Sequence, residues 1–226
     1  MFNSIKYDLH CHTNCSDGQL TPKQLVDRAI EMGVNALAIT DHDTIAAYQY
    51  INIKENSSIK IIPGIEFSSS WEKINVHIIG LNFKLDSTSL ETGIKFQQAA
   101  RSQRAAMIAS RLDNLGFKGS LAGAANIAKN GNIGRPHFAQ YLLDIGAVKD
   151  IDQAFKKYLG SGKPGDVKNF WADLPQIVSW IKEAGGIAVL AHPKKYKLTR
   201  NKLKRLLDDF IEAGGEGMEV ISGNQS

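Results

Sequence analysis

Few features of secreted, membrane or disulfide-rich proteins are present in this sequence. Only two cysteines occur among its 226 residues, Cys11 and Cys15. Two thiols this close together are not a disulfide scaffold, so reduced thiols are expected. No apolar run approaches the roughly 20 residues that a membrane-spanning helix needs. The N-terminus, MFNSIKYDLHCH, has no basic-then-apolar leader. We therefore expect a cytoplasmic protein with no membrane partner.

The sequence also has little excess of charge of one sign. Its 27 basic and 23 acidic residues give a formal net charge of +4, which is compatible with a phosphate-bearing substrate without requiring one. The one basic run, KKYKLTRNKLKR at 194–205, is interpreted as a solvated loop and helix face, so we expect no DNA sequence recognition. A metal-free nucleic-acid-binding module is the distant alternative.

What is present is an alternation of strand-like and helix-like segments. A helix is expected after the first strand, because Thr21 is a suitable N-cap, Pro22 suits the first helical position and Gln24 completes a capping box. The alternation predicts an α/β fold with a parallel sheet or barrel. The expected strands are Ser4–Leu9, Ala36–Thr40, Lys60–Glu66, Val76–Phe83, Gly186–Ala191 and Gly217–Ile221.

The pattern changes between residues 89 and 173. Successive helical patterns run to about Leu159, and the glycine-rich segment 160–173 is expected to be a loop. We interpret 89–173 as an inserted helical subdomain within a domain made of residues 1–88 and 174–226. Helices are also expected at Leu174–Ala184 and Asn201–Ala213.

The decisive segment is DLHCHTNCSD at 8–17. His10 and His12 are two residues apart at the end of a strand, so both imidazoles face the same side and can reach one metal ion. Asp17 follows in the loop. Imidazole and carboxylate ligands together suit Mn²⁺, Fe²⁺ or Zn²⁺.

Further metal-ligand residues follow along the chain. Asp41 and His42 come just after one strand, Glu66 and His192 end two others, and His77 lies early in a fourth. A single histidine is more often a surface or core residue than a ligand, but four of the six histidines sit at expected strand ends. If the strands are parallel, these ends converge where barrels place active sites. Zinc binding by Cys11 and Cys15 is the weaker reading.

The motifs H-x-H, a following Asp, T-D-H-D, P-G-x-E, an isolated His and A-H-P occur in that order. Together they resemble the PHP family of metal-dependent phosphoesterases, from about Tyr7 to Ser226. The resemblance implies a distorted, TIM-like (β/α)₇ barrel with two or three divalent ions, Mn²⁺ first and Fe²⁺, Zn²⁺ or Mg²⁺ as other candidates. It further implies that His10, His12 and Glu66 hold one metal, that Glu66, His77 and His192 hold a second, and that Asp17 and His42 hold the third.

The helical segment is similar to the ribonuclease AM-like branch of that family. The similarity lies in R-x-x-R at Arg101 and Arg104, G-R-P-H at 134–137 and Y-L-G-x-G-K-P at 158–164. Members of this branch are 3′,5′-nucleoside bisphosphate phosphatases that also degrade RNA from its 5′ end. The likeness implies that the insertion caps the metal site and that Arg135 and His137 contact a substrate phosphate. Arg101, Arg104 and Lys163 are further phosphate candidates, although a solvated helix face explains the two arginines equally well.

The resemblance and general chemistry suggest a mechanism. We expect metal-assisted hydrolysis of a nucleotide or short RNA phosphate ester, with Arg135 binding phosphate and His137 as the acid near the leaving group.

One departure leaves alternatives open. The family's final motif, S-D-x-H, supplies further ligands and is absent from this sequence, so the last strand is expected to be missing. The chain is then either a shortened copy of an enzyme or a natural remnant that binds metal or nucleotide without turnover. A histidinol-phosphate-type phosphatase is the enzymatic alternative. The sequence does not indicate the oligomeric state.

Overall fold

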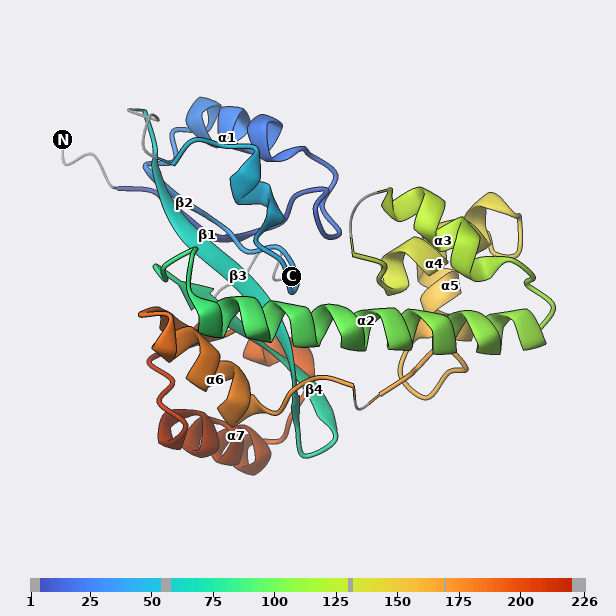
Figure 1. The fold of residues 1–226 in the computed structure, drawn as a ribbon. Helices are drawn as coiled ribbons and strands as arrows, with labels where there is room; N and C mark the ends of the chain where they lie inside the picture. Colours follow the sequence, from blue (N-terminus) through green and yellow to red (C-terminus); the bar gives the residue numbers. More distant parts are fainter. Residues whose placement is uncertain (1–4, 54–57, 130–131, 169, 221–226) are drawn as a thin grey trace. The chain divides into compact units, whose positions relative to one another are not determined.

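A computed structural model describes residues 5–53, 58–129, 132–168 and 170–220 (Figure 1). The chain forms two compact units, one made of Met1–Gln97 with Trp171–Ser226 and the other of Gln98–Phe170. The sequence pattern predicted the boundaries of the inserted subdomain at 88/89 and 173/174, whereas the boundaries between the two compact units lie at 97/98 and 170/171. None of the helices in the described ranges combines the length and the apolar character needed to cross a lipid bilayer.

The first unit is built on a six-stranded sheet whose order follows the sequence, β1-β2-β3-β4-β5-β6. β1 pairs with β2, β2 with β3, and β5 with β6 in parallel, whereas β4 is antiparallel to both β3 and β5. The strands are β1 (Tyr7–Cys11), β2 (Ala36–Ile39), β3 (Lys60–Trp71), β4 (Ile74–Leu81), β5 (Ile187–Leu190) and β6 (Gly217–Met218).

The expectation of a wholly parallel sheet is therefore wrong at two of the five pairings. β3 continues five residues past Glu66, where the strand was expected to end, and only Glu72 and Lys73 separate it from β4. Both turn residues have positive φ, 41° and 65°, as the type I′ turn of a two-residue hairpin requires. A connection this short cannot cross over to a parallel strand, so β4 must run back along β3.

The remaining elements of this unit cover the sheet. Helix α1 (Pro22–Glu31) begins as expected, with Thr21 as N-cap and a capping box closed by Gln24. Helices α6 (Leu174–Glu183) and α7 (Arg200–Glu212) pack their apolar faces into the same core as Phe67, Ile78 and Leu190. Two short 3-10 helices, η1 (Ala46–Gln49) and η3 (Pro193–Tyr196), follow β2 and β5.

The second unit is helical. It comprises most of α2 (Thr88–Asn114), which begins in the first unit, with α3 (Ser120–Ala128), α4 (Arg135–Asp144), α5 (Ile151–Ala154) and the π-helical turn η2 (Phe155–Leu159). Its own apolar core contains Leu112, Phe138, Leu142 and Leu159, all fully buried. The expected helices in this region are thus present.

Some expectations concern residues outside the described ranges. Ser4 and Ile221, expected ends of the first and last strands, lie there, and so does the sequence after Val220 that approaches the missing motif. The described residues form six strands of a mixed α/β fold. The seven-stranded barrel that the family resemblance implies, with its last strand missing from this chain, stays a prediction.

The sheet core yields a stability prediction. Phe67 on β3 is fully buried, whereas Phe96 on α2 is 50% exposed, and both rings contact Trp180. We expect Phe67→Ala to lower the free energy of unfolding by about 3–5 kcal/mol, because it leaves a cavity in addition to lost burial. The matched variant Phe96→Ala should cost clearly less. Urea unfolding measures both, and equal losses would contradict the assigned core.

Candidate metal centre

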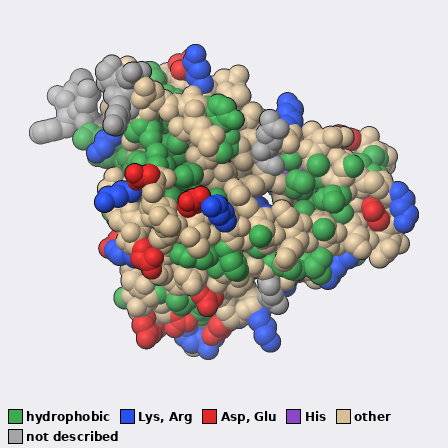
Figure 2. Space-filling view, viewed as in Figure 1, with side chains coloured by type: hydrophobic (Ala, Val, Ile, Leu, Met, Phe, Trp, Pro, Cys, Tyr) green, Lys and Arg blue, Asp and Glu red, His purple; other side chains and the backbone are tan. Residues whose placement is uncertain are grey.

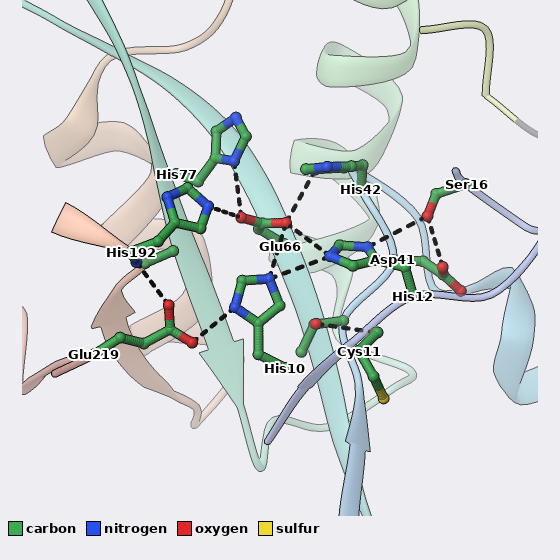
Figure 3. Close-up of polar contacts among 12 residues, drawn as sticks. His10, Cys11, His12, Ser16, Asp41, His42, Glu66, His77, His192 and Glu219 are labelled. Atoms are coloured by element: carbon green, nitrogen blue, oxygen red, sulfur yellow. Dashed lines mark hydrogen bonds and ion pairs between the residues drawn. The ribbon is translucent and has the colours of Figure 1, made fainter. Parts of the chain in front are cut away.

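A buried carboxylate forms the middle of the candidate site. Glu66 lies in the central part of β3 with its side chain 1% exposed. Five imidazoles surround its two oxygens (Figure 3). Their nearest nitrogens lie 3.3 Å (His10), 3.2 Å (His12), 3.2 Å (His42), 2.8 Å (His77) and 2.9 Å (His192) from a Glu66 oxygen. Asp17 completes the group, 3.6 Å from both His12 and His42.

All seven residues that the sequence singled out as metal ligands are thus brought together in one place. His10 belongs to β1 and His12 follows it, while His42 and His192 follow β2 and β5. The parallel strands β1, β2 and β5 present these side chains near their C-terminal ends, as the sequence argument expected. Glu66 and His77 instead lie within their strands.

The antiparallel hairpin explains how His77 joins the group. In the β3–β4 ladder His77 is the partner of Ser68, and Ser68 lies two residues from Glu66. Side chains two apart on a strand point to the same face, and directly paired residues share a face as well. His77 therefore points to the side of the sheet that carries Glu66, although it is not at a strand end.

The spacing of the donor atoms provides a test of fit for a metal ion. Nε2 of His10, Nε2 of His12 and Oε2 of Glu66 form a triangle with sides of 3.2, 3.2 and 3.3 Å. Metal–nitrogen bonds of about 2.1 Å in tetrahedral geometry place ligand atoms roughly 3.4 Å apart. The triangle has nearly this size, so these three residues fit a single cation.

Two further groups of three fit the same criterion of convergent ligand atoms. They are His12, Asp17 and His42, and His42, Glu66 and His77, with all ligand atoms of a group within 4.8 Å of one another. His192 approaches Glu66 through Nε2, while its buried Nδ1 has no hydrogen-bond partner among the described residues. The donor set of imidazoles and carboxylates suits Mn²⁺, Fe²⁺ or Zn²⁺.

The pKa values of Glu66 and of the histidines around it are shifted by burial and by one another. Burial alone would raise the pKa of Glu66, but the neighbouring charges of His42 and His77 and hydrogen bonds from His10 and His12 hold it well below its usual value. Burial likewise disfavours charge on His10, yet hydrogen bonds to Glu219 and Glu66 raise the pKa of His10 to about 9. Burial dominates at His192 and lowers its pKa. Glu66 is therefore ionised, which is the state in which a carboxylate can bind metal.

Two aspartates of the T-D-H-D segment support the ligands. Asp41, 1% exposed, accepts hydrogen bonds from Thr13 N, Thr13 Oγ1 and Ser16 Oγ, each 2.6 Å long. These bonds fix the loop that leads from His12 to Asp17. Asp43, fully buried, accepts from Ser68 N at 2.8 Å and Ser68 Oγ at 2.9 Å. His42 is thus held between two anchored carboxylates.

Gln97 links this network to the ends of the helical segment. Its fully buried amide donates through Nε2 to Asp43 Oδ1 at 3.1 Å and to the carbonyl of Ser68. Its Oε1 accepts from the backbone N–H of Ala172 at 3.1 Å. The point where the chain leaves the sheet unit and the point where it returns therefore meet at one side chain.

Sequence reasoning missed two residues that contact the ligands. Glu219, just after β6, bonds His10 and the backbone of His192. Tyr196 accepts from the backbone N–H of His77 at 2.8 Å and donates to Ala191 O at 2.8 Å. The one signal for Glu219 is that it is an acidic residue in the last expected strand, and this does not reveal its contact with His10, 209 residues away. Nothing in the sequence marks Tyr196.

The arginines of the helical unit form a separate basic cluster. Arg104 is 7% exposed and donates from Nε to Val167 O at 2.9 Å, so it is not part of a solvated helix face. Burial together with the positive charges of Arg135 and Arg101 lowers the pKa of Arg104 to about 10. Arg135 donates to Leu159 O at 3.3 Å. The carboxylate of Asp166 opposes the lowering by burial and acts to raise the pKa values of both Arg104 and Arg135.

His137 and Lys163 lie elsewhere in the same unit. Nδ1 of His137 accepts a hydrogen bond from the Gly134 N–H at 2.9 Å, which caps α4. The proton of the neutral ring must therefore be on Nε2. Lys163 lines an open pocket of about 640 Å³ with Gln153, Lys156, Lys157 and Tyr158.

The structure gives no support to the two alternative readings of the sequence. On the face shown in Figure 2, Lys and Arg side chains are interspersed with Asp and Glu. Lys204 and Arg205 of the basic run pair with Asp208 and Glu72. The Cys11 thiol donates to Ala38 O at 3.2 Å, away from the imidazoles, and none of the ligand groups among the described residues contains a cysteine.

Comparisons with known proteins find relatives along nearly the whole chain. Over 222 residues the chain is 43% identical to a 5′-3′ exoribonuclease of Haemophilus influenzae, covering 98% of this chain and 81% of the relative. It is 42% identical to a 3′,5′-nucleoside bisphosphate phosphatase of Chromobacterium violaceum over 97% of this chain and 78% of that protein.

Solved structures match as well. An amidohydrolase from Chromobacterium violaceum with bound sulfate and no metal superposes with a TM-score of 0.91 at 41% identity, over 98% of this chain and 78% of that one. A protein from Bifidobacterium adolescentis thought to be a metal-dependent phosphoesterase gives 0.84 at 27% identity, over 96% and 77%. The family model described as PHP domain matches residues 8–159. This chain therefore belongs to the PHP domain family.

Proposed function

We propose that this protein is a metal-dependent phosphoesterase that hydrolyses nucleotide phosphate esters, namely 3′,5′-nucleoside bisphosphates and short 5′-phosphorylated RNA. The observation that carries the proposal is the convergence of five imidazoles and Asp17 around the buried carboxylate of Glu66. The relatives named as an exoribonuclease and a bisphosphate phosphatase support the substrate class.

The sheet unit would hold two or three divalent ions, with Mn²⁺ the preferred candidate. When bound, such ions neutralise phosphoryl oxygens and make water acidic enough to ionise near neutral pH, lowering its pKa from 15.7 toward about 7. His10, His12 and Glu66 would hold one ion, and His77, His192 and Glu66 would hold another. Asp17 and His42 would hold the third, with His12 close to both.

The helical unit would bind phosphate and handle the leaving group. Arg135, with Arg101 and Arg104 beside it, holds a substrate phosphate through charge-assisted hydrogen bonds. Lys163 adds a positive charge in its pocket. His137 carries its ring proton on Nε2 and would donate a hydrogen bond from it to the leaving oxygen, while the proton that this oxygen finally takes up would come from solvent water. The prediction that residues 89–173 cap the metal centre belongs to this proposal.

The first test removes the bridging carboxylate. In Glu66→Gln we expect at least one equivalent of bound Mn²⁺ to be lost and phosphate release from adenosine 3′,5′-bisphosphate to fall by more than about 100-fold, beyond the loss typical of an outer ligand partner. Elemental analysis and a phosphate assay measure these effects. Glu183→Gln, on the exposed face of α6, is the matched control and should retain both. Full activity in the Glu66 variant would overturn the proposal.

The second test concerns the phosphate-binding arginines. We expect Arg135→Ala to raise KM for the bisphosphate about 10- to 100-fold, the effect of losing a charged hydrogen bond of about 1.5–3 kcal/mol. Arg135→Lys should recover only part of the lost affinity for the bisphosphate, because an ammonium group cannot form the bidentate hydrogen bonds to phosphate that a guanidinium forms. Arg111→Ala is the control, because Arg111 is an exposed arginine of the same unit whose guanidinium donates to the backbone carbonyls of Pro164 and Asp166. Equal effects at positions 111 and 135 would count against the assignment.

Substrate class is tested by competition. A short 5′-phosphorylated RNA should inhibit hydrolysis of the bisphosphate, because both occupy the same phosphate-binding groups. Histidinol phosphate should not compete and should not be hydrolysed at a comparable rate. Preference for histidinol phosphate would favour the other phosphatase class, and metal binding without any turnover would favour the binding remnant.

A further inference from the structure

Glu219 touches two of the candidate ligands at once. It follows β6 directly, and its backbone N–H donates to Leu190 O at 3.0 Å, which places the residue beside the end of β5. From there its side chain reaches Nδ1 of His10 at 2.7 Å with Oε1 and the backbone N–H of His192 at 2.6 Å with Oε2 (Figure 3). The side chain is 13% exposed.

The contact with His10 determines which ring nitrogen can bind a cation. An ionised carboxylate only accepts hydrogen bonds, so Nδ1 of His10 must carry a proton. In the neutral ring the lone pair is then on Nε2. Nε2 is the atom that lies 3.2 Å from His12 Nε2 and 3.3 Å from Glu66 Oε2. Glu219 therefore turns the metal-binding side of His10 toward the cluster.

The contact with His192 holds an unfavourable backbone. His192 has φ 28° and ψ 57°, in the left-handed region that side chains other than glycine seldom adopt. Its N–H is fixed by Glu219 Oε2, and in this conformation its Nε2 lies 2.9 Å from Glu66 Oε1. The same carboxylate thus orients a second ligand.

We propose that Glu219 is a positioning residue of the metal centre, one that fixes the tautomer of His10 and the backbone of His192 and does not itself bind metal. Both of its oxygens are already engaged, and it belongs to none of the three groups of convergent ligand atoms in the described part of the chain. Carboxylates that accept from a ligating histidine commonly play this part. The inference rests on the proposed function, since it concerns the same centre.

Glu219→Gln tests the proposal. Two donors face two acceptor oxygens in the wild type, but glutamine offers one oxygen and one NH₂ group. Whichever way the amide turns, either His10 or His192 faces a donor. We expect Mn²⁺ affinity, measured by calorimetry, to fall about 10- to 100-fold. Glu216→Gln is the control, because Glu216 lies three residues away and pairs with Lys182 on the surface; it should bind Mn²⁺ as tightly as wild type.

A spectroscopic measurement distinguishes loss of the orientation of His10 and His192 from general unfolding of the variant. In Zn²⁺-loaded wild-type protein, nitrogen-resolved NMR should show a proton on Nδ1 of His10 and a protected amide at His192. One of these two signals should be lost in folded Glu219→Gln. Unchanged Mn²⁺ affinity with both signals present would overturn the proposal, and so would a wild-type His10 bound to metal through Nδ1, even if the variant fails to fold. Wild-type protein that binds Mn²⁺ but releases no phosphate would overturn the proposed function alone.

Discussion

The carboxylate of Glu66 organises the whole sheet unit, because a buried charge needs partners that hydrogen bond to it or share a cation with it. Its partners come from β1, the loops after β2 and β5, and β4. The ends of these strands, the paths of the loops and the pairing of β4 with β3 are therefore what allow the imidazoles to reach Glu66. Asp41 and Asp43 also keep the candidate ligands in place. The buried oxygens of Asp41 accept hydrogen bonds from the loop between His12 and Asp17. Asp43 accepts from Ser68 on β3, which anchors the loop that carries His42.

Much of the site could be predicted from the sequence because its signals are local. His10 and His12 are adjacent on one strand face, and His42 and His192 follow short apolar segments that end abruptly. Parallel strands gather such ends at one edge, so spacing alone brings four imidazoles together. The capped start of α1 was likewise predictable, since Thr21, Pro22 and Gln24 lie within four residues.

The rest depended on pairing between distant segments. The expected strand ended at Glu66, yet Ser68–Ser70 continue it and pair with Asn75–His77, which places His77 beside Glu66. Burial of Arg104 depends on the backbone of Val167, 63 residues away. Glu219 reaches His10 across 209 residues. No window of the sequence contains both partners of such contacts, so neither the burial nor the pairing could be foreseen.

The meeting of Gln97 with Ala172 bears on how this family can diversify. A segment of more than seventy residues departs from the sheet unit and returns to it within one side chain's reach. The two ends of the inserted segment are thus joined to each other within the sheet unit. Insertions of other lengths or folds could be exchanged there without altering the strands that carry the imidazoles. Recognition of a substrate could then evolve separately from the chemistry performed on it.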